Sequence, residues 1–138
     1  MIPKFRAWDS EANIMIYSDH RTRKLYDVYY GFEMNEKGEL ECRWEGDFTE
    51  SHVLDGGILD NIMQYTGLKD KNGVEIYEGD VLFHPLQGRR KVFYPYSETV
   101  ASYGLRNIDN GFGSTLQDSH AVWEVIGNIY ENPELLEV

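Results

Sequence analysis

Strict two-residue alternation over residues 39–45 is the feature that most constrains this fold. Leucine, cysteine and tryptophan alternate there with charged residues. Because successive side chains of a β-strand point to opposite faces, the segment predicts a half-buried antiparallel strand. A turn-forming stretch, residues 35–38, precedes it, and the aromatic stretch 25–34 comes before that turn. Together the three segments predict a β-hairpin.

Short strands and turns continue along the rest of the chain, which predicts an all-β fold of antiparallel hairpins. The best helix candidate, residues 52–63, contains Gly56 and Gly57, each worth about 1 kcal/mol against a helix. The glycine-rich segment 104–114 is typical of a loop, and Pro133 lies in a predicted single helical turn. The other predicted strands are residues 4–8, 14–17, 62–68, 74–77, 80–84, 90–96 and 121–130.

Length and charge bound the class of protein. The chain has 138 residues, about one domain's worth, and 13 Lys+Arg against 24 Asp+Glu give a net charge of −11. Aromatic residues make up 14% of the chain, which excludes a disordered acidic tail. Negative charge repels phosphates, so general nucleic-acid binding is disfavoured. A boundary near residues 55–57 predicts two β lobes, residues 1–57 and 58–138, either separate or packed as one compact unit.

The single cysteine and the hydropathy pattern indicate a compartment. Cys42 excludes an intramolecular disulfide framework and is typical of a reducing cytosol. Apolar runs stay below the roughly 18 residues that a membrane span needs. We therefore expect a cytoplasmic protein that does not enter the membrane.

Residue types that carry catalysis are present without the spacing that such sites need. Cys42 lies on the apolar face of its predicted strand, where a thiol packs as a small hydrophobe. The turn at residues 70–73 shares positions with a calcium loop but lacks its closing glutamate, so a hairpin turn is the better interpretation. We expect no catalytic residue, no metal and no cofactor. None of the histidines is paired at metal-ligand spacing: they are His20, His52, His84 and His120.

Two basic clusters interrupt the acidic chain. The first is formed by Arg21, Arg23 and Lys24. The second is formed by residues 89–91 and is followed by the aromatic residues at 93, 94 and 96. Tyrosine and arginine are favoured at protein interfaces. Solvated strand ends and ordinary strand packing are the competing interpretations. The candidate partner-contact residues are Arg89, Arg90, Lys91, Tyr94 and Tyr96.

Three blocks of sequence are distinctive: residues 4–9 (KFRAWD), 63–81 (MQYTGLKDKNGVEIYEGDV) and 125–136 (VIGNIYENPELL). Taken in order, they resemble the YopX family, small proteins encoded by phages and prophages of Gram-positive bacteria. The resemblance implies an all-β protein of the bacterial host cytoplasm, with a second lobe similar to an SH3-like barrel, and it carries over no catalytic residue. In the middle block, Gly79 allows a sharp entry into a strand and Asp80 can accept a backbone hydrogen bond there.

The leading hypothesis is a non-catalytic phage accessory protein that binds a host or phage protein. One alternative is an acidic DNA mimic that occupies a host DNA-binding protein, since the chain is strongly negative. Another is a small barrel that binds single-stranded nucleic acid by stacking bases on aromatic side chains. A hydrolase would require histidines and acids to converge in the fold. Exposed strand edges leave self-association open as well.

Overall fold

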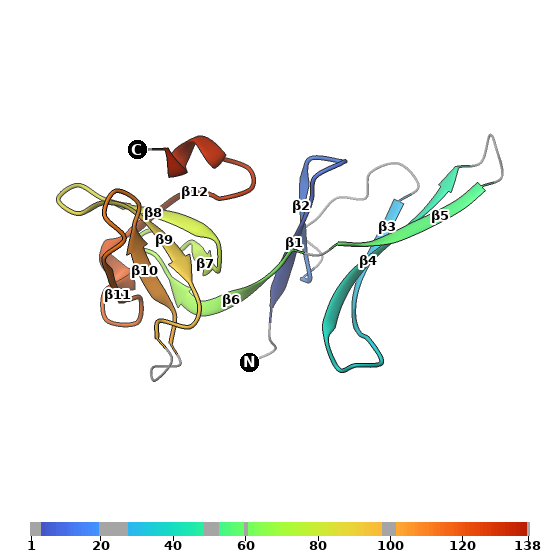
Figure 1. Ribbon diagram of the computed structural model, residues 1–138, viewed down its shortest axis with the longest axis horizontal. Helices are drawn as coiled ribbons and strands as arrows, with labels where there is room; N and C mark the ends of the chain where they lie inside the picture. Colours follow the sequence, from blue (N-terminus) through green and yellow to red (C-terminus); the bar gives the residue numbers. More distant parts are fainter. Residues whose placement is uncertain (1–3, 20–27, 49–52, 60, 98–101, 138) are drawn as a thin grey trace. The chain divides into compact units, whose positions relative to one another are not determined.

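The computed structural model describes residues 4–19, 28–48, 53–59, 61–97 and 102–137, and in these ranges every strand pairing is antiparallel. This confirms the predicted all-β fold (Figure 1). Within the described ranges, no helix is long and apolar enough to cross a membrane. The elements are β1 (Phe5–Asp9), β2 (Ile14–Tyr17), β3 (Val28–Met34), β4 (Leu40–Phe48), β5 (Val53–Leu59), β6 (Ile62–Lys69), β7 (Glu75–Tyr77), β8 (Asp80–His84), β9 (Gly88–Phe93), β10 (Gly104–Asn107), β11 (Gly113–Thr115), the 3-10 turn η1 (His120–Val122), β12 (Glu124–Asn128) and the 3-10 turn η2 (Pro133–Leu136).

The chain divides into two compact units, residues 1–64 and residues 65–138. The division falls within β6, further along the chain than the glycine pair at which the sequence suggested a boundary. Residues 62–64 of β6 pair with β1, and residues 65–69 pair with β7. Gly56 and Gly57 instead lie inside β5, paired with β4.

The first unit packs the β1–β2 hairpin on one face of the three-stranded sheet β3–β4–β5. The alternation of residues 39–45 decides which face of β4 is buried, because it places Cys42 inward, buried with Ala7 and Ile16. Tyr30 and Phe32 of β3 pack on the same cluster. The predicted hairpins β1–β2 and β3–β4 are thereby confirmed, apart from residues 25–27, which lie outside the described residues.

The second unit is built on a five-stranded sheet in the order β11–β10–β9–β8–β12, together with the hairpin of β6 and β7. Its C-terminal segment ends in η2, the predicted helical turn. Side chains from both halves of the unit meet in one core. The buried members of that core are Ile76, Leu82, Val92, Leu105, Leu116 and Trp123.

Glycines misled the sequence analysis at two places. The best helix candidate, residues 52–63, is strand at residues 53–59 and 62–63, and the glycine-rich segment 104–114 is largely the hairpin of β10 and β11. In both, a large ring occupies the space of a missing side chain. A Cβ on Gly57 would lie 2.5 Å from Nε1 of Trp44, and one on Gly104 would lie 2.6 Å from Cζ of Phe93. These strand positions are occupied by glycine because a neighbouring ring packs directly on the backbone and leaves no room for a side chain.

Candidate functional site

The three consecutive basic residues Arg89, Arg90 and Lys91 do not share one face, because neighbouring residues of β9 point to opposite sides of the sheet. Arg90 lies opposite Leu82 of β8, and its guanidinium carbon is 5.4 Å from the ring centroid of Trp123. The same side chain donates a hydrogen bond of 2.8 Å from Nη1 to Oγ of Ser114. Arg90 therefore lies on the core side of the sheet, where it stabilises the packing of β11 and Trp123.

Arg89 ties the end of the chain to β9. Its Nη1 donates to the carbonyl of Leu135 at 2.7 Å, and its Nη2 donates to the carbonyl of Glu137 at 2.6 Å. These oxygens belong to η2 and the residue that follows it, and the last carbonyl groups of a helical turn have no partner within the turn. Arg89 supplies that partner from a strand.

Lys91 projects from the opposite face to Arg90, because neighbours in a strand alternate. It lies directly opposite Arg106 of β10 in the antiparallel register. The Arg106 guanidinium carbon is 4.5 Å from the ring centroid of Phe93, a cation–π distance. Neither cation has an acidic partner among the residues that the structure describes. Like charges directly opposite each other in a sheet repel, so the pair favours an anion from outside.

Aromatic rings border these two cations. Gly104 lies beneath Phe93, and a Cβ there would also approach Cδ2 of Tyr96 to 3.0 Å. A Cβ on Gly113 would lie 3.4 Å from Cε2 of Tyr96. The rings of Phe93 and Tyr96 thus pack against the backbone at Gly104 and Gly113. We call Lys91, Phe93, Tyr96 and Arg106 the β9–β10 cluster.

Tyr94 occupies a different position from this cluster. It is 49% exposed, and its ring centroid is 5.0 Å from that of Tyr103, which packs on the core of the second unit. Burial, followed by the charge of Glu78, raises the pKa of Tyr103 to about 12. Two of the five predicted contact residues lie on either side of Arg106: Lys91 is opposite it in β9, and Tyr96 packs at Gly113, which is opposite it in β11. The other basic triplet, at residues 21, 23 and 24, lies outside the described residues.

Sequence reasoning missed Arg106. Its segment contains several glycines and was interpreted as a loop, so no strand register was available to place it opposite Lys91. The available signal was the pattern of Phe93 followed by glycines in the next strand, which is typical of a ring packed on backbone.

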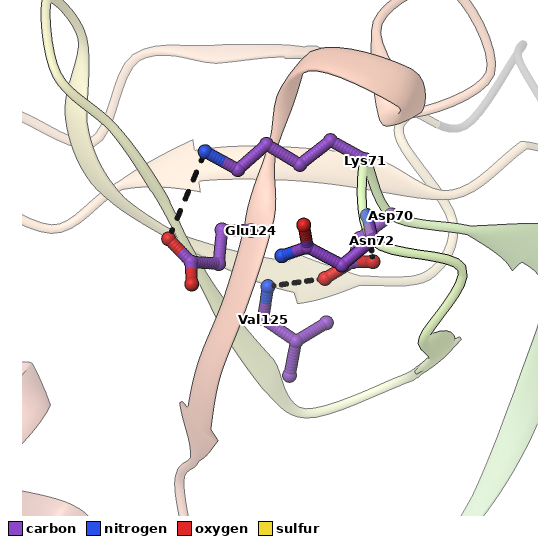
Figure 2. Close-up of polar contacts among 5 residues, drawn as sticks. All are labelled: Asp70, Lys71, Asn72, Glu124 and Val125. Atoms are coloured by element: carbon purple, nitrogen blue, oxygen red, sulfur yellow. Dashed lines mark hydrogen bonds and ion pairs between the residues drawn. The ribbon is translucent and has the colours of Figure 1, made fainter.

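Asp70 closes the turn between β6 and β7 (Figure 2). Its Oδ1 accepts hydrogen bonds from the backbone N–H groups of Asn72 at 2.8 Å and Val74 at 2.9 Å. Its Oδ2 accepts one from the N–H of Val125 in β12, at 2.9 Å. The side chain is only 5% exposed, so the carboxylate is satisfied by backbone donors. This supports the hairpin-turn interpretation over a calcium loop, and the described residues contain no group of three or more potential metal ligands.

The two histidines in the described residues take part in local structure. Nδ1 of His84 accepts a hydrogen bond from the N–H of Leu86 at 3.1 Å. Nδ1 of His120 lies 2.6 Å from the carbonyl of Lys69. His20 and His52 lie outside the described residues.

Cys42 is fully buried, as the alternation predicted. Burial and the nearby charge of Asp9 raise the pKa of its thiol to about 12. The thiolate is the reactive form of cysteine, so this residue is held in its inert form.

A model of the family described as "YopX protein" matches residues 4–137. This chain belongs to the YopX family. Among solved structures it is similar to protein EF1440 from Enterococcus faecalis, with 29% sequence identity over 99% of each chain and a TM-score of 0.50. No curated protein matches the chain.

The blocks that resemble the YopX family contain residues that form turns and link strands in this fold. Asp70 belongs to the middle block and Val125 to the last one, so their hydrogen bond joins the two blocks. Asp80 is 2% exposed, and its Oδ2 accepts a hydrogen bond of 2.7 Å from the N–H of Tyr77, as its sequence suggested. Gly79 has a φ of 86°, which allows the sharp entry into β8. The sequence blocks that resemble the YopX family therefore include residues that form the turns of this fold.

Proposed function

We propose that this YopX-family chain is a non-catalytic phage or prophage accessory protein that binds an acidic segment of a host or phage protein. The β9–β10 cluster is the contact surface. The observation that carries the proposal is the pair Lys91 and Arg106, two cations side by side in a chain whose net charge is −11.

Three physical points support a protein partner. Arginine and aromatic side chains are enriched at protein contacts, and the cluster offers both with little conformational freedom, since Arg106 lies on Phe93. Carboxylates of an acidic segment would relieve the repulsion between the two cations. The overall negative charge repels the phosphates of a nucleic acid over longer distances, which disfavours that class of partner.

Affinity capture from lysogenic host cells tests this proposal. The double variant Lys91→Ala with Arg106→Ala is expected to lower recovery of the partner by about tenfold or more, because both charges would be at the centre of the contact. The matched control, Lys37→Ala with Lys71→Ala, removes two exposed cations elsewhere and is expected to leave recovery unchanged. Equal losses for both variants, or no loss for the first, would contradict the placement of the site.

A further inference from the structure

The outward face of the sheet β3–β4–β5 is hollowed at its centre. Gly31 of β3 lies opposite Arg43 of β4, and Arg43 in turn lies opposite Ile58 of β5. A Cβ on Gly31 would have nothing within 4 Å. The resulting hollow has a volume of about 260 Å³ and is bordered by Tyr29 and Glu45.

Large apolar side chains lie exposed beside this hollow. Tyr29 is 58% exposed and Ile58 is 47% exposed, while the opposite face of the same sheet packs on the core of the first unit. Burial of such side chains by a partner is favourable in proportion to the apolar area covered. Exposed apolar side chains around a hollow are typical of an interaction surface.

The charges around the hollow indicate the chemistry of the occupant. Glu41, Arg43 and Glu45 are alternate residues of β4, so all three lie on this face. The Nε atom of Arg43 is 3.3 Å from Oε1 of Glu33, which draws this cation toward β3. The face continues into a second hollow of about 590 Å³ that is bordered by Glu36, Glu39 and one further cation, Lys37. The two hollows together are lined by five glutamates against Arg43 and Lys37. A surface of this charge favours a cationic occupant.

We propose that this face binds an extended segment of a partner protein with two Lys or Arg residues four positions apart and a large apolar residue midway between them. Glu41 and Glu45 are four residues apart on one strand, which is roughly 14 Å at about 3.4 Å per residue. An extended segment lying along β4 repeats that spacing. Its middle side chain enters the hollow above Gly31, against Tyr29.

This inference goes beyond the proposed function, because it concerns the other unit of the chain and a partner of opposite charge. A protein with both surfaces would hold an acidic segment on its second unit and a basic segment on its first. Each surface can fail its own test without affecting the other.

Fluorescence anisotropy with two rhodamine-labelled peptides tests the proposal on the full chain at low salt. The first peptide, Ser-Lys-Ser-Leu-Ser-Lys-Ser, has the proposed spacing. The second, Ser-Lys-Leu-Ser-Lys-Ser-Ser, has the same composition but places its cations on opposite faces of an extended chain. We expect the first peptide to bind at least about fivefold more tightly than the second, since an exposed ion pair contributes up to about 1 kcal/mol.

Two variants locate the binding. Gly31→Leu fills the hollow without changing any charge, and space at this position means that the fold should be kept. It is expected to abolish the preference for the first peptide. Glu41→Gln with Glu45→Gln is expected to weaken binding of the first peptide roughly fivefold. The matched control, Glu11→Gln with Glu134→Gln, removes the same charge elsewhere and should weaken it much less.

Each other outcome would overturn the proposal. Equal binding of the two peptides would show general attraction to an acidic chain, and no binding of either would show that the face does not accept such a segment. If the wild-type chain self-associates and Gly31→Leu is monomeric, as measured by light scattering, the occupant of the face is a second copy of this chain.

Discussion

Replacement of Asp70 by alanine is expected to destabilise the second unit by roughly 3–5 kcal/mol. The carboxylate accepts three backbone hydrogen bonds in a position that is 5% exposed. Its removal leaves those N–H groups without their acceptor, at about 1–3 kcal/mol for each buried group that stays unsatisfied. Urea denaturation measures the loss, and hydrogen exchange is expected to accelerate at the amides of Asn72, Val74 and Val125.

Lys71→Ala is the control for this change. Its Nζ is 3.9 Å from Oε2 of Glu124, and both side chains are more than 40% exposed (Figure 2). Removal of such an exposed ion pair is expected to cost less than about 1 kcal/mol. If Asp70→Ala lowered the free energy of unfolding by no more than Lys71→Ala does, the role assigned to this turn would be wrong.

Asp9→Ala is expected to destabilise the first unit by about 3 kcal/mol. Oδ1 of Asp9 accepts hydrogen bonds from the N–H groups of Glu11 and Ala12, each at 3.1 Å, and Oδ2 accepts one from the hydroxyl of Tyr30 at 2.8 Å. This carboxylate therefore holds the β1–β2 turn and also joins it to β3. Alanine leaves all three donors without their acceptor. Tyr30→Phe removes only one hydrogen bond and is expected to cost about 1 kcal/mol in the same denaturation experiment.

The same contact gives the first unit a dependence on alkaline pH. Burial, followed by the hydrogen bond to Asp9 and its charge, raises the pKa of Tyr30 above its ordinary value near 10. The folded state thus favours the protonated phenol. Its contribution to stability is complete below about pH 10 and is lost as pH rises further, because the unfolded tyrosine ionises first. Tyr30→Phe is expected to reduce this alkaline loss. An unchanged pH profile would contradict the role of the contact.

Local patterns predicted most of the hairpins. Alternation in β4 was enough to place Cys42 inward, because the side-chain period of a strand does not depend on its partners. Turn chemistry at residues 70–73 was enough to place the β6–β7 turn. Both features involve residues close in the sequence, where the backbone alone decides the outcome.

Contacts between distant residues could not be predicted in this way. The hydrogen bond from Val125 to Asp70 joins residues that are 55 positions apart. The register that places Arg106 opposite Lys91 required a strand in a segment whose glycines indicated a loop. Arg90, predicted as a contact residue from its neighbours in sequence, lies beside Trp123 on the core side. In β9, unlike β4, basic residues fall on both faces, so the sequence does not show which face meets the core until the neighbouring strands are known.

The hollow above Gly31 was missed for a related reason. A glycine in a predicted strand has no distinctive pattern of its own, and the hollow depends on which residues lie beside it in β4 and β5. The acidic residues of this face were visible only as part of the total charge.

Zero-length carbodiimide crosslinking of the captured complex tests the central claim most directly. This reagent joins a lysine amine to a carboxylate only where the two are in contact. The account predicts a crosslink from Lys91 to an aspartate or glutamate of the partner, identified by mass spectrometry and lost in Lys91→Ala. Crosslinks confined to other lysines of this chain, such as Lys37 and Lys71, with none at Lys91, would contradict the claim that the β9–β10 cluster binds an acidic partner.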